Sequence, residues 1–110
     1  MIEVIDKGDH LFVIKVVVRE VYSMDIPNLK ELLLDAVREN GIKRLVVDLG
    51  DVYMMTSSGL GVFYYVNKSL ESQLRLASVN PEVKKVLEMT KINSIVTICP
   101  TVDEAIASFG

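Results

Sequence analysis

The fold is decided by residues 45–61, which read Leu45-Val46-Val47-Asp48-Leu49-Gly50-Asp51-Val52-Tyr53-Met54-Met55-Thr56-Ser57-Ser58-Gly59-Leu60-Gly61. The apolar start of this stretch predicts a buried strand, and its end places two adjacent serines where a helix is expected to begin. A helix N-terminus presents unpaired backbone N–H groups and a partial positive charge, so a hydroxyl there can cap the helix or carry a phosphate. The choice between these two roles bears directly on the function of the chain.

Strand and helix patterns alternate on both sides of this stretch. The periodicity of apolar residues predicts strands over residues 2–5, 10–18, 43–49, 73–79 and 95–99, and helices over residues 27–40, 57–70, 81–89 and from 102 onward. Pro27 suits the first turn of its helix and Gly41 the C-terminal cap. Asn80 and Thr101 are the predicted N-caps of the last two helices.

The order of these elements predicts an α/β fold. The first two strands form an antiparallel hairpin, and the later alternation of strand and helix implies right-handed crossovers in a mixed, mostly parallel sheet. If the strands lie side by side in chain order, every crossover puts its helix on the same face. The four helices should then lie mainly on one face, leaving the other partly exposed. Polar residues within the predicted apolar strands agree with this: Lys15, Arg19, Arg44, Gln73 and Arg75.

Composition restricts the classes of function. With 110 residues, half of them hydrophobic, the chain is expected to form one domain. A net charge of −3 gives no basic footprint for nucleic acid. The apolar runs are far shorter than the ~20 residues that cross a bilayer, and no signal peptide is recognisable. Cys99 is the single cysteine, so it is expected to be a small buried hydrophobe. We therefore predict a cytoplasmic protein that binds neither nucleic acid nor membrane.

Two other kinds of chemistry do not fit the sequence. Asp48 near the end of a predicted strand and Asp51 just after it suggest a response-regulator receiver domain. Such a domain needs an acidic pair after its first strand and a lysine near the end of its last strand, and both are absent here. Asp48 is instead expected to bond the backbone of the next loop. A serine hydrolase would need a base near Ser58, but His10 lies on a remote strand and no Gly-x-Ser-x-Gly motif is present. We predict no catalytic residue, no metal site and no cofactor.

The aromatic and methionine residues near the serines are interpreted first as packing. Tyr53, Met54 and Met55 occupy a loop, where alternate side chains are expected to enter the core. One exposed methionine there would suit a partner interface. Tyr64 and Tyr65 are consecutive on a helix, so one is expected in the core and the other on the surface.

The chain resembles a known family. The strand Val46-Val47-Asp48-Leu49, the hydrophobic loop and the run Ser57-Ser58-Gly59-Leu60-Gly61 resemble the central signature of STAS domains, specifically of the bacterial anti-sigma factor antagonists. The resemblance covers nearly the whole chain and predicts a single STAS domain over residues 1–110. In that family the second serine of the pair is phosphorylated by an anti-sigma factor that is also a protein kinase. The unphosphorylated antagonist binds this anti-sigma factor and frees the sigma factor.

The resemblance implies a modification site and a contact surface. The phosphorylated residue is expected to be Ser58, with Ser57 as the alternative, and the partner an anti-sigma factor of the serine kinase type. The domain itself is expected to be a monomer or a weak homodimer. The implied partner-binding residues are Tyr22, Ser23, Met54, Met55, Thr56, Ser57, Ser58, Gly59 and Leu60.

The chain departs from the family pattern at two positions. Thr56 stands where the family usually has Asp before the serine pair, and Tyr22 stands where the family often has Asp after the second strand. These changes favour an alternative function, in which a STAS scaffold or ligand-sensing module of another signalling complex has lost the phosphoswitch.

Overall fold

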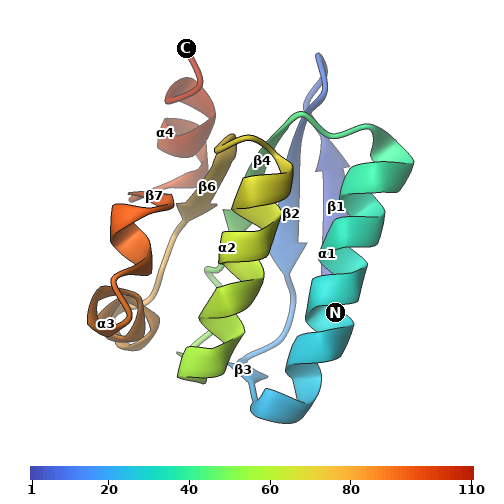
Figure 1. Cartoon of the computed structure of the whole chain (residues 1–110). Coiled ribbons are helices and arrows are strands. Elements are labelled where there is room, and N and C mark those ends of the chain that lie inside the picture. The colour runs from blue at the N-terminus through green and yellow to red at the C-terminus, as the bar shows by residue number, and fades with distance from the viewer.

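A five-stranded sheet forms the centre of the molecule, and the computed structural model describes all residues, 1–110 (Figure 1). The strands are β1 (Ile2–Asp6), β2 (Leu11–Val16), β3 (Glu20–Val21), β4 (Arg44–Asp48), β5 (Met54–Met55), β6 (Leu74–Ala77) and β7 (Thr97–Cys99). The α-helices are α1 (Ile26–Asn40), α2 (Leu60–Ser69), α3 (Pro81–Met89) and α4 (Val102–Ala107), and the 3-10 turns are η1 (Ser23–Asp25), η2 (Ser57–Gly59) and η3 (Ile92–Ser94). None of the helices is long and apolar enough to span a membrane.

The strands of the large sheet lie side by side in the order β1, β2, β4, β6 and β7, which is the chain order. β1 is antiparallel to β2, and every later pair of neighbours is parallel. One long helix connects each parallel pair: α1 between β2 and β4, α2 between β4 and β6, and α3 between β6 and β7. The predicted mixed sheet, opened by a hairpin, is confirmed.

The two faces of the sheet are covered unequally. α1, α2 and α3 bury the larger apolar core against one face, with Leu33, Phe63 and Val83 fully buried. α4 packs on the opposite face, where Ala105 joins a smaller cluster around Val46. Three of the four helices therefore share one face, as predicted. α4 lies on the other face because it follows the last strand and is not part of a crossover.

The polar residues of the strands lie on the face that carries α4. Lys15, Arg44 and Arg75 each stand two positions from a residue of the smaller cluster, so they point to the same side of the sheet. The guanidinium carbon of Arg75 lies 4.4 Å from the ring centroid of Phe109. These three positions agree with a partly exposed face, whereas Arg19 and Gln73, also predicted to be in strands, lie outside them.

A second, two-stranded sheet pairs β3 with β5 in parallel. The sequence predicts neither strand, because two residues are too few to show an alternating pattern. Glu20 is opposite Met54, and Val21 is opposite Met55. The pair extends beyond the carboxyl ends of β2 and β4. It therefore brings the segments that follow β3 and β5 together.

Asn80 has a different role from the predicted N-cap. Its side chain makes no capping hydrogen bond with α3. Its amide instead donates to the carbonyl oxygens of Gly50 (3.0 Å) and Val52 (2.8 Å), which holds the loop after β4 in place. The predicted cap of α4 is present, because the hydroxyl of Thr101 accepts a hydrogen bond of 3.1 Å from the backbone N–H of Glu104.

Candidate functional site

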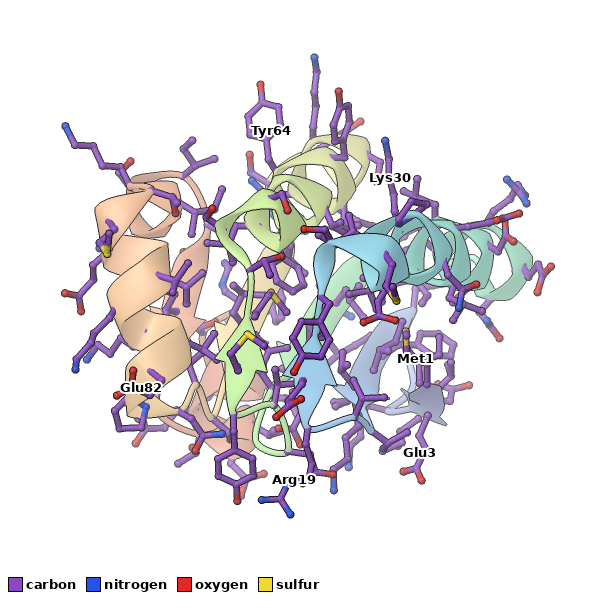
Figure 2. The ribbon with its side chains drawn as sticks, turned by 90° about the horizontal axis from the view of Figure 1, so that it is seen from below. Met1, Glu3, Arg19, Lys30, Tyr64 and Glu82 are labelled. Atoms are coloured by element: carbon purple, nitrogen blue, oxygen red, sulfur yellow. The ribbon has the colours of Figure 1, made fainter.

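Two similar turns lie side by side at the carboxyl ends of β3 and β5. Each strand leads directly into a 3-10 turn and then into a long helix, η1 and α1 in one case and η2 and α2 in the other. In η1 the N–H of Asp25 bonds the carbonyl of Tyr22, and in η2 the N–H of Gly59 bonds the carbonyl of Thr56, both at 2.9 Å. Figure 2 views the molecule from this edge. The serine pair therefore lies beside residues 22–25.

The serine pair forms the exposed part of η2. Ser57 and Ser58 are both exposed, while Thr56 is half-buried and extended in backbone conformation. The hydroxyl oxygens of Thr56 and Ser58 are 3.2 Å apart, within hydrogen-bond distance. No acidic residue lies in η2 or in the first turn of α2. The Ser58 hydroxyl therefore lies on an exposed turn that is fixed by a backbone hydrogen bond and has no carboxylate beside it on α2.

Only part of the predicted contact surface is accessible. The exposed members are Tyr22, Ser23, Ser57 and Ser58, and the half-buried members are Met54 and Thr56. Met55, Gly59 and Leu60 are buried, so we remove these three from the predicted contact surface. A Cβ built at Gly59 would lie 3.0 Å from Cγ of Met55, so the Met55 side chain would have to shift by a few tenths of an ångström. The small residue at position 59 thus fits the space left by the Met55 side chain.

Tyr22 is held by its own segment. Its hydroxyl donates a hydrogen bond to the Glu20 carboxylate, and its backbone N–H donates to the Asp25 carboxylate at 2.9 Å. The hydrogen bond to Glu20 raises the pKa of Tyr22 above its ordinary value, and partial desolvation and the charges of Glu20 and Asp25 act in the same direction. Tyr22 therefore stays neutral at physiological pH, and two carboxylates flank the position where the family pattern has Asp.

Met24 belongs to the same surface but was missed from the sequence. Its side chain is 85 % exposed in η1. Met24 is the second residue of its turn, as Ser58 is of η2. A flexible, polarizable thioether suits an adaptable binding surface. The equivalence of the two turns could have drawn attention to Met24, but it becomes visible only when β3 and β5 are paired.

The tyrosines near the serines are more exposed than predicted. Tyr64 and Tyr65 are 41 % and 54 % exposed, so the expectation that one of them enters the core is wrong. α2 buries only its sheet side, and both positions fall on its outer side. Tyr53 is also exposed, with its ring centroid 5.1 Å from the guanidinium carbon of Arg19. Of the three loop residues before the serines, only Met55 is in the core.

The remaining candidates lie away from the serine pair. Asp48 accepts a hydrogen bond of 2.9 Å from the N–H of Gly50, as predicted, and Cys99 is buried. His10 is exposed, with Nδ1 3.1 Å from the carbonyl oxygen of Gly41. It lines the largest hollow, about 670 Å³, which lies at the amino ends of β2 and β4 and thus at the opposite end of the sheet from Ser58. No cluster of three His, Cys, Asp or Glu side chains could hold a metal ion.

Comparison with known proteins identifies the family. The sequence model of the STAS domain matches residues 3–105. The chain belongs to the STAS domain family. This STAS domain is 33% identical, over 79 residues, to a candidate anti-sigma factor antagonist of Thermotoga maritima; the match covers 69% of this chain and 70% of the relative.

Solved structures support the same assignment of fold. An anti-sigma factor antagonist from Mycobacterium paratuberculosis has a TM-score of 0.85 to this STAS domain at 22% identity, covering 98% of this chain and 92% of that one. The unphosphorylated form of the anti-sigma factor antagonist SpoIIAA has a TM-score of 0.79 at 18% identity, covering 99% of this chain and 96% of that one. At these identities the structural likeness establishes the shared fold.

Proposed function

We propose that this STAS domain is an anti-sigma factor antagonist. In this proposal it acts in the cytoplasm, has no catalytic activity of its own, and sequesters an anti-sigma factor of the serine kinase type. Two observations support the assignment: the Thermotoga maritima relative is named as a candidate antagonist, and SpoIIAA, which shares the fold, has been solved in both phosphorylated and unphosphorylated forms.

The exposed hydroxyl of Ser58 carries the proposal. It lies on η2 beside Tyr22, Ser23 and Met24, so one partner surface can cover both turns. A phosphate on Ser58 would add about −1.5 to −2 charges and three acceptor oxygens. The turn is held by backbone hydrogen bonds that the phosphate does not touch, so the fold tolerates the group. A packed interface does not, and phosphorylation therefore releases the anti-sigma factor.

The first test identifies the modified residue. The histidine-kinase-like anti-sigma factor encoded nearest to this chain is incubated with it and ATP, and the product is mapped by mass spectrometry. We expect one phosphate on Ser58, none in Ser58→Ala, and continued modification of Ser57→Ala. A phosphate that stays in Ser58→Ala and disappears in Ser57→Ala would transfer the role to Ser57.

The second test measures the switch. Ser58→Asp should weaken binding to the same anti-sigma factor by about tenfold or more, because it places a charge in the interface, while the melting curve stays nearly unchanged. Asn93→Asp adds the same charge on the exposed turn η3 and should bind like the wild type. Equal binding by wild type and Ser58→Asp would contradict the switch.

A second candidate function follows from the serine turn itself. Thr56 supplies a hydroxyl where the family usually has a carboxylate, and that hydroxyl lies 3.2 Å from Ser58. A STAS scaffold or ligand-sensing module without a phosphoswitch would keep the surface and lose the modification. Stable binding to a partner with no phosphate on Ser58 in the presence of ATP would favour this alternative.

A further inference from the structure

α1 and α2 start from equivalent turns, and they differ most on their outer sides. Ile26 and Leu60 are the first residues of the two helices. The fifth and sixth positions of α1 are charged: Lys30, which is half-buried, and Glu31, which is exposed. In α2 the same positions are Tyr64 and Tyr65, both exposed. Because α1 has charged residues at these positions, the fold does not require aromatic residues there, and another reason is needed for the two tyrosines of α2.

The tyrosines are held in a fixed arrangement. Their ring centroids are 6.0 Å apart and the rings are nearly perpendicular, at 80°. The ammonium nitrogen of Lys30 lies 3.8 Å from the centroid of the Tyr65 ring, which is a cation–π contact between α1 and α2. Tyr64 and Lys30 point outward on the same side of the molecule, away from Arg19 and Glu3 (Figure 2). Aromatic side chains that are already ordered lose little entropy when a partner binds.

This surface continues from the serine pair along α2. Gly61, Tyr64, Tyr65 and Lys68 are all exposed and follow one another at helical spacing, starting one turn after Ser58. A Cβ built at Gly61 would meet no heavy atom within 4 Å, so the space beside it is open. We call Gly61, Tyr64, Tyr65 and Lys68, together with Lys30, the tyrosine ridge.

The charge of the tyrosine ridge is of one sign. From residue 52 to residue 70 the only charged residue is Lys68, and Lys30 adds a second ammonium from α1. No carboxylate belongs to the ridge. A complementary surface would therefore be apolar at its centre, to bury the aromatic rings, and acidic at its rim.

We propose that the tyrosine ridge is the second half of the surface that binds the anti-sigma factor, which presents an apolar pocket with carboxylates at its rim. The inference rests on the proposed function and names the partner chemistry of that same site. Tyr64 and Tyr65 supply the buried anchors, because tyrosine is enriched among the residues that dominate binding energy. A phosphate on Ser58 would lie next to this acidic rim, so the switch works by repulsion of like charges and needs no change of fold.

The test compares exposed tyrosines on two sides of the molecule. Tyr65→Ala and Tyr64→Ala should each weaken binding to the histidine-kinase-like anti-sigma factor, measured by titration calorimetry, by about tenfold or more. Tyr53 is as exposed as Tyr65, at 54 %, but it packs with Arg19 on the opposite side of the molecule. Tyr53→Ala should bind within about twofold of the wild type. Melting curves of the three variants check that each remains folded.

The charge part has its own variant. Lys68→Glu should weaken binding by about tenfold and reduce its dependence on salt, because it places a carboxylate against the acidic rim. Lys84→Glu makes the same change on an exposed position of α3 and serves as the control. If Lys68→Glu binds as tightly as Lys84→Glu, the claim that the partner carries an acidic rim is overturned.

The outcomes separate this inference from the proposed function. Wild-type protein that does not bind the anti-sigma factor overturns both. If Ser58→Asp weakens binding but Tyr64→Ala and Tyr65→Ala bind like the wild type, the proposed function stands. The role of the tyrosine ridge in binding is then overturned. Equal losses in Tyr53→Ala and Tyr65→Ala also overturn it, because the effect would not be specific to α2.

Discussion

The turns η1 and η2 are built alike in their backbones and completed differently by their side chains. Each follows a two-residue strand, each is closed by a hydrogen bond of 2.9 Å, and each opens a long helix. In η1 the third residue is Asp25, whose carboxylate accepts the N–H of Tyr22. In η2 the third residue is Gly59, which has no side chain that could accept a hydrogen bond from the N–H of Thr56. The backbone alone is thus sufficient to form the turn.

The difference shows where the sequence is free to serve function. η1 uses its acidic side chain to complete its own start, so its third position is structurally committed. η2 has no such carboxylate, and its third residue, Gly59, is buried next to the side chains of Met55 and Ile26. The side chains of the two serines of η2 are needed neither to close the turn nor to pack the core. They can therefore be used by a partner or a kinase without loss of the fold.

The largest predicted effect comes from overpacking the buried position of η2. Gly59→Ala should destabilise the protein by about 1–3 kcal/mol, because the new methyl would lie 3.0 Å from Cγ and 3.3 Å from Sδ of Met55. Denaturant unfolding followed by circular dichroism measures the change. A stability equal to that of the wild type would mean that Met55 moves aside at no cost.

Gly61 provides the matched control within the same helix. Gly61→Ala meets open space and replaces a helical glycine, so it should stabilise the protein by about 0.5–1 kcal/mol. The two glycines of one motif should thus respond to the same substitution with opposite signs. Equal changes in the free energy of unfolding at both positions would show that helix propensity, and not the contact of position 59 with Met55, decides stability here.

The elements with a long periodic pattern could be predicted from the sequence, and the short ones could not. The spacing of Leu29, Leu33 and Ala36 predicts α1, and the run around Val46 predicts β4. β3 and β5 have two residues each, too few for a periodic pattern, and are held by their pairing and by the burial of Val21 and Met55 in the core. The site depends on that pairing, so Ser58 could be predicted from its motif while Met24 could not. Tyr64 and Tyr65 were misassigned because residue type alone does not show how much of α2 the sheet covers.

α1 and α2 also differ at a buried position near the sheet. Leu33 of α1 and Asn67 of α2 are each the eighth residue of their helix, and both are buried. Oδ1 of Asn67 has no hydrogen-bond partner, so its burial costs free energy. Asn67→Leu, which copies α1, should stabilise the protein by about 1 kcal/mol in thermal or denaturant unfolding.

Asn80 is the contrasting position for the same substitution. Its amide donates to two loop carbonyls, which Asn80→Leu would leave without a donor. The expected cost is about 1–3 kcal/mol. If Asn67→Leu instead destabilises the protein, the side-chain amide of Asn67 makes a stabilising hydrogen bond. α2 would then depend on a buried polar contact that α1 lacks.

The smallest predicted effect concerns the residues that precede the two turns. The hydroxyl of Tyr22 is bonded to a carboxylate, whereas the hydroxyl of Thr56, its counterpart, lies against that of Ser58. The pKa of Tyr22 is raised because the folded protein favours the protonated phenol. The stabilisation is therefore complete below the ordinary tyrosine pKa of about 10, and it is lost as the pH rises through the higher folded pKa.

Replacing the acceptor tests this difference. Glu20→Gln should move the pKa of Tyr22 down toward its ordinary value, because it removes the charge and the carboxylate that accepts the phenol proton. The ring resonances of Tyr22, followed by NMR through an alkaline titration, report the midpoint. Glu3→Gln removes an equal charge on the exposed strand β1 and should leave the midpoint unchanged. A midpoint that does not move in Glu20→Gln would show that Glu20 does not hold the Tyr22 hydroxyl, and the contrast between the turns would then rest on the bond from the Tyr22 N–H to Asp25 and on Gly59.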